Sequence, residues 1–130
     1  MLHHITLWVP DLARAEKSWS WLLGELGYTR DPDIERVVLF RHPSGFAVAL
    51  EQSSDMVPGM LYSRLRPGLN HMAFRLERPE QLQAIVDDCP SYGWAVMPID
   101  HHQIAGGADV AYIEDSDGFE VELVAPLEVR

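Results

Sequence analysis

The amino-acid sequence predicts an α+β protein built from two repeated modules, each containing a strand, a helix and then further short strands. A Leu-x-His segment followed by alternating apolar residues occurs twice, at residues 2–9 and 69–76. A Gly-Phe-x-Val-x-Leu segment also occurs twice, at residues 45–50 and 118–123, and the two matches follow the same order along the chain. A repeat of this kind indicates two copies of one supersecondary unit that pack together.

A helical pattern follows the first strand of each module. The first helix is expected from about residue 11 to 23, where apolar residues recur every three or four positions. Asp11 is a residue type preferred at the N-cap, and Gly24 or Gly27 would end the helix. The second helix is expected from about residue 79 to 89, with a proline suited to its first turn.

Short β-like runs follow each helix, and a linker without clear periodicity separates the two halves. The expected strands are 36–41, 46–51, 95–98, 110–114 and 119–124. We therefore expect a single domain, with module one at 1–52, the linker at 53–67 and module two at 68–130. Extra residues of the second module are placed near 101–107.

The composition describes one folded domain and excludes several classes of partner. The chain has 130 residues, of which 47% are hydrophobic and 23% charged. The formal net charge of −10 disfavours nucleic acid and anionic membranes as partners. No apolar run approaches the roughly 20 residues that span a bilayer, and the N-terminus lacks a signal-peptide pattern. The single cysteine cannot form an internal disulfide, which fits a cytoplasmic location.

The alternation of apolar and polar residues places three potential metal ligands on equivalent faces. In a strand, alternate side chains share a face, and the apolar residues mark the face that packs under the helix. His4, His71 and Glu122 all lie on the opposite face of their strands. A polar surface role is the alternative for either histidine alone, but their equivalent positions in two repeats favour a shared site. Two imidazoles and one carboxylate can bind Fe, Mn, Zn, Ni or Co and leave positions open for substrate.

These residues resemble the vicinal oxygen chelate superfamily, which includes glyoxalase I, extradiol dioxygenases, fosfomycin-resistance proteins and bleomycin-resistance proteins. The resemblance extends over essentially the whole chain and is carried by residues 2–12, 21–27, 68–74 and 111–123. It implies two tandem βαβββ modules that form a cupped mixed sheet around a central site. It also implies a divalent metal and a substrate whose adjacent oxygens chelate that metal. The ligand positions of the family correspond here to His4, His71 and Glu122.

The fourth ligand position departs from the glyoxalase pattern. The repeat aligns Glu122 with Ala49, which cannot bind a metal. Glu51 follows two residues later and could replace it only if the strand register shifts. The remaining set of two histidines and one glutamate resembles the extradiol dioxygenases or fosfomycin-resistance proteins more than glyoxalase I. Ring-cleaving dioxygenation, isomerisation or lyase chemistry, and thiol addition to an epoxide all remain open.

Other side chains near these faces have the chemistry to contact a substrate or move a proton. The substrate-contact candidates are Thr6, Trp8, Arg75 and His102. The acid–base candidates are Glu51, Tyr62 and Tyr112. Arg75 has an alternative role in an ion pair with Glu120. Trp8 has an alternative role in packing at the rim, and His102 could be a solvated surface residue.

The leading hypothesis from the sequence is a metal-dependent enzyme, either a dioxygenase, a lyase or isomerase, or a resistance-type transferase. The rival hypothesis is a metal-free protein that binds or sequesters a small molecule, as in the bleomycin-resistance group. The absence of a carboxylate at Ala49 favours the rival, whereas the three retained ligand types favour the enzyme. The resemblance also implies a homodimer, with the modules paired within one chain or exchanged between two chains.

Overall fold

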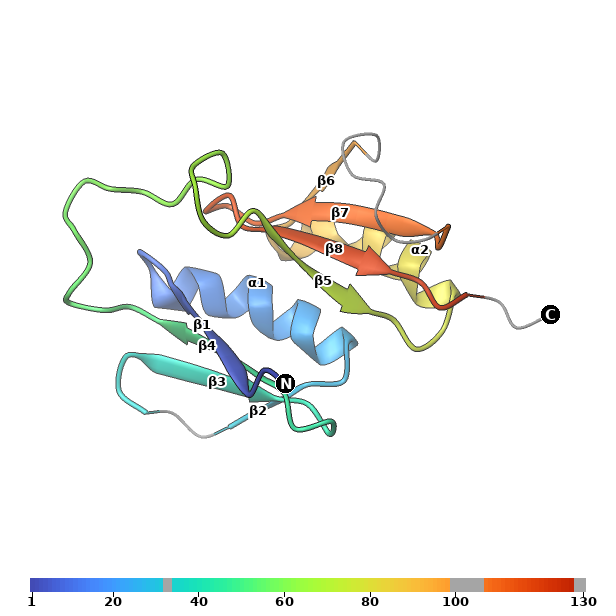
Figure 1. Ribbon diagram of the computed structural model, residues 1–130, viewed down its shortest axis with the longest axis horizontal. Coiled ribbons are helices and arrows are strands. Elements are labelled where there is room, and N and C mark those ends of the chain that lie inside the picture. The colour runs from blue at the N-terminus through green and yellow to red at the C-terminus, as the bar shows by residue number, and fades with distance from the viewer. Residues whose placement is uncertain (32–33, 99–106, 128–130) are drawn as a thin grey trace. The chain divides into compact units, whose positions relative to one another are not determined.

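The computed structural model describes residues 1–31, 34–98 and 107–127. The chain forms two compact units, Met1–Leu61 and Tyr62–Arg130, and the boundary between them lies inside the predicted linker. Each unit contains one four-stranded sheet with a helix (Figure 1). His101 and His102, with most of the predicted extra residues, lie outside the described residues.

The first unit has the strand–helix–three-strand order of a βαβββ module. Its elements are β1 His4–Trp8, α1 Leu12–Glu25, β2 Thr29–Arg30, β3 Val37–Arg41 and β4 Ala47–Glu51. The strand order is β1-β4-β3-β2, so the first strand lies beside the last. The pairing of β1 with β4 is parallel, and the other two pairings are antiparallel. The very short β2 was not foreseen from the sequence.

The helix α1 forms where the sequence predicts it and packs on β3 and β4. Asp11 is the N-cap, and its Oδ1 accepts a hydrogen bond of 3.0 Å from the backbone N–H of Arg14. The apolar stripe is buried, and Trp19 and Leu22 have no exposed surface. The helix continues past Gly24 and ends before Gly27, whose φ of 89° suits glycine.

The second unit repeats the same arrangement. Its elements are β5 His71–Arg75, α2 Glu80–Asp88, the 3₁₀ helix η1 Cys89–Tyr92, β6 Ala95–Met97, β7 Val110–Glu114 and β8 Glu120–Val124. The strand order is β5-β8-β7-β6, with β5 and β8 parallel and the other pairs antiparallel. The predicted α+β class with two βαβββ modules is therefore confirmed.

The second helical segment is more interrupted than the sequence suggests. The helix α2 starts after Pro79 and is followed directly by η1, which ends at Gly93 in the left-handed conformation with φ 85°. Ile85 and Cys89 carry the buried stripe, and Cys89 Sγ lies 3.9 Å from the carbonyl oxygen of Trp94, which is also buried. None of the helices in the described part of the chain is long and apolar enough to span a membrane.

The second sequence match corresponds to two equivalent hairpin turns. The β3–β4 turn is closed by a hydrogen bond from Gly45 N–H to the His42 carbonyl. The β7–β8 turn has the same bond from Gly118 N–H to the Asp115 carbonyl. Both glycines have positive φ, 96° and 85°, which a side chain would disfavour. These equivalent turns confirm the gapless alignment of the two modules at this point.

Candidate metal centre

In the second unit, the parallel pairing of β5 with β8 places a histidine beside two carboxylates. His71 is the register partner of Glu120, and Ala73 is the partner of Glu122. Residues two apart in a strand share a face, so His71, Glu120 and Glu122 all lie on one face. The other face carries Phe74 and Val121, which are buried on the helix side. The expected facing of His71 and Glu122 is therefore present within this unit.

The two carboxylates are buried, which requires compensating partners. Glu120 is 1% exposed and Glu122 is 6% exposed, whereas glutamates are rarely buried without a partner. The Tyr112 hydroxyl, on the neighbouring strand β7, donates a hydrogen bond to Glu122 Oε1. Burial, and then this hydrogen bond, raise the pKa of Tyr112 above its ordinary value. Tyr112 therefore stays protonated and acts as the donor that holds the Glu122 carboxylate.

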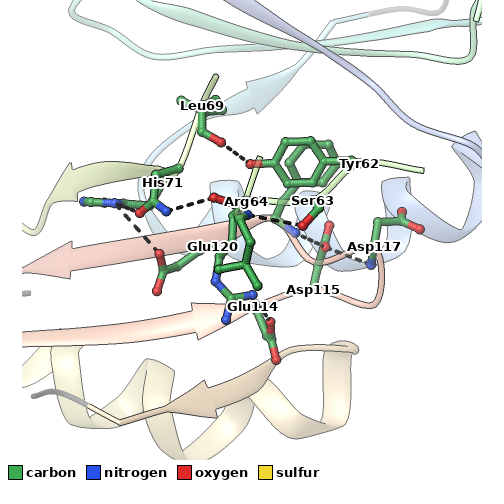
Figure 2. A network of polar contacts seen from close by, with 12 residues as sticks. Tyr62, Ser63, Arg64, Leu69, His71, Glu114, Asp115, Asp117 and Glu120 are labelled. Atoms are coloured by element: carbon green, nitrogen blue, oxygen red, sulfur yellow. Dashed lines mark hydrogen bonds and ion pairs between the residues drawn. The ribbon is translucent and has the colours of Figure 1, made fainter. Parts of the chain in front are cut away.

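Glu120 is a site residue that the sequence reasoning did not select. Its Oε2 lies 3.8 Å from His71 Nδ1 (Figure 2). Arg75, considered as its ion-pair partner from the sequence, instead lies beside Val124 at the other end of β8. The repeat alignment could have identified Glu120, because it matches Glu120 with Ala47 in the same way as it matches the selected Glu122 with Ala49. The register confirms this equivalence, since Ala47 is the partner of His4.

The segment Tyr62–Asn70 lies against this face of the second unit. The Tyr62 ring stacks on Phe119, with ring centroids 4.1 Å apart, and its hydroxyl donates to the Leu69 carbonyl. The Arg64 Nη1 donates to Glu114 Oε2 at 3.0 Å (Figure 2). Burial raises the pKa of Tyr62, which keeps its hydroxyl protonated as a donor. The predicted linker is thus, in its second part, a structural component of the site.

The turn before β8 is fixed by Asp115. Its Oδ1 accepts hydrogen bonds from the backbone N–H groups of Asp117 and Phe119, at 3.0 and 2.9 Å. Asp115 is 6% exposed, and the two bonds satisfy a carboxylate oxygen that would otherwise be costly to bury. The turn therefore sets the start of β8, the strand that carries both glutamates.

In the first unit, the β4 residues beside His4 and Thr6 are alanines rather than carboxylates. His4, Thr6 and Trp8 are exposed along β1, as the alternation predicted. Ala49 pairs with Thr6, as Glu122 pairs with Ala73 in the second unit. Glu51 pairs with Trp8, about 13 Å along the strand from His4 at the usual rise per residue. The register shift that would bring Glu51 toward His4 is absent, and its catalytic role stays a prediction.

The donor types fit a divalent metal, although the three predicted ligands belong to different units. His4 lies in the first unit, and His71 and Glu122 lie in the second. Across the residues that the structure describes, no group of three or more His, Cys, Asp or Glu side chains is arranged to hold a metal. The meeting of the three ligands therefore stays a prediction. The fit rests on the paired imidazole and carboxylate face of the second unit, whose nitrogen and oxygen donors suit such a metal.

Comparison with known proteins decides the family. The model of the glyoxalase/bleomycin resistance protein/dioxygenase superfamily matches residues 3–112. The chain belongs to this superfamily. It is also 34% identical over 127 residues to the protein YqjT of Bacillus subtilis (strain 168), an alignment that covers 96% of this chain and 98% of YqjT.

Solved structures of this superfamily share the fold. A candidate glyoxalase from Bacillus halodurans has a TM-score of 0.84 and 31% identity, covering 97% of this chain and 96% of its own. A glyoxalase/bleomycin resistance protein from Albidiferax ferrireducens T118 has a TM-score of 0.73 and 19% identity, covering 96% and 98%. A variant of the fosfomycin resistance protein FosX from Listeria monocytogenes, complexed with Mn(II) and dihydroxypropylphosphonic acid, has a TM-score of 0.68 and 20% identity, covering 98% and 90%.

Proposed function

We propose that this superfamily member is a metal-dependent enzyme that acts on a small substrate with two adjacent, metal-chelating oxygens. The observation that carries the proposal is the face of the second unit, where His71 and Glu122 lie on neighbouring parallel strands. His4 is the repeat equivalent of His71 and is the third proposed ligand. The FosX structure with Mn(II) supports a divalent metal in this fold.

The bound metal would supply a Lewis acid that stabilises negative charge on a chelating oxygen of the substrate. The residues of this chain would have separate tasks. Tyr112 would hold the Glu122 carboxylate in place through its hydrogen bond. Thr6 and Arg75, which lie on the faces of the ligand histidines, would bind substrate oxygens, and Trp8 would contact the substrate through its ring.

The candidates for proton transfer differ in the hydrogen bonds that their side chains make within the protein. Tyr62 and Tyr112 both donate their hydroxyl protons to protein groups, the Leu69 carbonyl and Glu122 respectively. Glu51 is half-buried at the end of β4. We therefore propose Glu51 as the acid–base group if a substrate extends along β1 toward Trp8. The proposed contact by His102 falls outside the described residues.

Metal analysis of untagged protein tests the proposal. The expected result is about one divalent ion per chain, with loss of that ion in His4→Ala, His71→Ala and Glu122→Gln. His42→Ala is the matched control, because His42 lies in the β3–β4 turn and contacts Ser44. Substoichiometric metal in the wild type, unchanged by the three ligand substitutions, would refute the enzyme as proposed.

The alternative function is a metal-free binding protein of the bleomycin-resistance type. Ala47 and Ala49 favour it, because they are the β4 partners of His4 and Thr6 and neither carries a carboxylate. Isothermal titration of the metal-free protein against bleomycin separates the two functions. Tight binding without metal supports the alternative.

We further propose that the protein is a homodimer. We also propose a reducing, cytoplasmic compartment, which fits the single buried thiol of Cys89. Mixing His4→Ala with Glu122→Ala chains tests whether the modules are exchanged between chains. Metal restored in the mixture would support exchange, and a mixture that stays metal-free would support pairing within one chain.

A further inference from the structure

Asn70 immediately precedes β5 and contacts the histidine that begins that strand. Its side chain has two polar ends, and each has a defined neighbour. The Asn70 Nδ2 donates to the Arg64 carbonyl at 3.0 Å. The Asn70 Oδ1 lies 2.8 Å from His71 Nδ1. The amide therefore bridges the backbone of the preceding segment and the imidazole ring.

This pair of contacts determines which ring nitrogen carries the proton. A backbone carbonyl can only accept a hydrogen bond, so the NH₂ end of Asn70 must face Arg64. The Oδ1 end then faces His71, and an amide oxygen is also only an acceptor. The 2.8 Å contact is a hydrogen bond only if His71 Nδ1 carries a hydrogen. The neutral imidazole must then have its lone pair on Nε2.

Glu120 provides a second acceptor on the same side of the ring. Its Oε2 lies 3.8 Å from His71 Nδ1, and its side chain is fully buried. A nearby carboxylate also favours a proton on Nδ1 rather than on Nε2. Asn70 and Glu120 thus act in the same direction on the tautomer of His71.

The segment that carries Asn70 contacts the rest of its unit at two points, and a third contact lies within the segment itself. The Tyr62 ring stacks on Phe119, its hydroxyl donates to the Leu69 carbonyl, and Arg64 forms an ion pair with Glu114 (Figure 2). The Arg64 carbonyl that accepts the hydrogen bond from Asn70 therefore belongs to a residue whose side chain is bound to β7. These contacts set the position of Asn70.

The first unit has a side chain in the same place. His3 is the repeat equivalent of Asn70, and its Nδ1 lies 2.8 Å from His4 Nδ1. The two rings meet edge to face, with centroids 5.1 Å apart. An imidazole can donate or accept, so His3 orients the ring of His4 without dictating its tautomer. In both units the preceding residue engages Nδ1 of the strand histidine, which directs Nε2 away from that neighbour.

We propose that Asn70 is a positioning residue that fixes His71 as the Nδ1–H tautomer, so that Nε2 presents its lone pair to a divalent metal. This inference rests on the proposed function, because the metal gives the tautomer its purpose. Ligating histidines commonly donate their second ring N–H to an oxygen acceptor, and loss of that acceptor typically weakens metal binding about 10–100-fold. Asn70 supplies the acceptor here.

The tautomer is measured directly in metal-free protein labelled with ¹⁵N-histidine. Long-range ¹H–¹⁵N correlation spectra at about pH 8, where an ordinary imidazole is neutral, distinguish protonated from unprotonated ring nitrogens. The expected result for the wild type is a proton on His71 Nδ1. A proton on Nε2 in the wild type would overturn the proposal without further experiments.

Two substitutions at Asn70 separate positioning from folding. Asn70→Ala removes the acceptor, and we expect the His71 signals to shift toward the Nε2–H form. Asn70→Asp keeps an oxygen acceptor but loses the donor to Arg64, and we expect it to retain the Nδ1–H form. Gln83→Ala is the matched control, because this amide on α2 donates to Asp87 in the same unit, and we expect the tautomer to stay unchanged. If Asn70→Ala fails to fold, Asn70→Leu, which also lacks the acceptor but keeps nearly the same side-chain volume, replaces it with the same expected shift toward the Nε2–H form.

Titration with Mn(II) gives the second readout. Asn70→Ala should weaken Mn(II) binding about 10–100-fold, with most of the affinity restored in Asn70→Asp. If the wild type holds the Nδ1–H tautomer, Asn70→Ala loses it and the wild type binds no metal, the proposed function fails and the positioning by Asn70 stands. If the wild type binds Mn(II) and Asn70→Ala changes neither affinity nor tautomer, the positioning fails and the proposed function stands.

Discussion

Replacing Tyr112 with phenylalanine tests the energetics of the buried carboxylate. Tyr112 has no exposed surface, and its hydroxyl donates to Glu122, which is 6% exposed. The substitution removes one oxygen atom and keeps the ring, so packing changes little. Hydrogen bonds to charged groups contribute about 1.5–3 kcal/mol, and a buried group left without its partner costs a comparable amount. We expect the free energy of unfolding to fall by about 2–3 kcal/mol at pH 7.

Urea unfolding, followed by tryptophan fluorescence and circular dichroism, measures this loss by linear extrapolation. Tyr92→Phe is the matched control in the same unit, because Tyr92 is 46% exposed. Its change in stability should stay within about 0.5 kcal/mol, as for most surface substitutions. A Tyr112→Phe variant as stable as the control would refute the reasoning.

The same variant has a signature at high pH. Burial and the bond to Glu122 raise the pKa of Tyr112 in the folded state, whereas the unfolded chain loses this proton near pH 10. Above about pH 10 the folded state binds more protons than the unfolded state, so wild-type stability falls as pH rises. Phenylalanine has no such proton. The stability difference between wild type and variant should therefore narrow above about pH 10, and a constant difference would contradict the assignment.

Two further substitutions test the local structure. Asp11→Ala should lower the free energy of unfolding by about 1 kcal/mol through loss of the N-cap of α1. Asp11→Asn can still accept the hydrogen bond from the backbone and should stay near the wild type in thermal unfolding. Equal losses of stability in both variants would exclude capping. Phe119→Ala should cost about 3–5 kcal/mol, because the ring is 3% exposed and supports Tyr62. Phe119→Leu should cost less in the same urea assay, and a loss under about 1 kcal/mol for the alanine variant would show that the stack carries no packing energy.

The fold was predictable because two simple patterns extend through the chain, the alternation of apolar and polar residues in the strands and the repeat of one module. The alternation in β1 placed Leu7 and Val9 in the core and Trp8 on the exposed face, and the structure agrees. The repeat also predicted that Ala49 is the equivalent of Glu122, and the register agrees, because Ala49 pairs with Thr6 as Glu122 pairs with Ala73. Strand β2 escaped prediction because its two residues are too few to show a period.

The site was predictable only in part, because burial on the polar face depends on tertiary contacts. The sequence indicated that Glu122 faces away from the helix, and β8 confirms this. It gave no sign that Glu120 and Glu122 are both buried, since that depends on the tyrosine of β7 and on the segment from Tyr62 to Asn70. That segment has no regular period, so its attachment to the sheet could not be inferred from the linker composition.

The order of strands in each sheet has a consequence for folding. The histidine-bearing strands β1 and β5 pair with β4 and β8, the last strands of their units, whereas β3–β4 and β7–β8 are local hairpins. Non-local pairing forms more slowly, because the chain must first lose the entropy of closing a long loop. We therefore expect each hairpin to form first and its histidine strand to join afterwards. During synthesis, β1, which carries His4, could pair in its sheet only after β4 had left the ribosome.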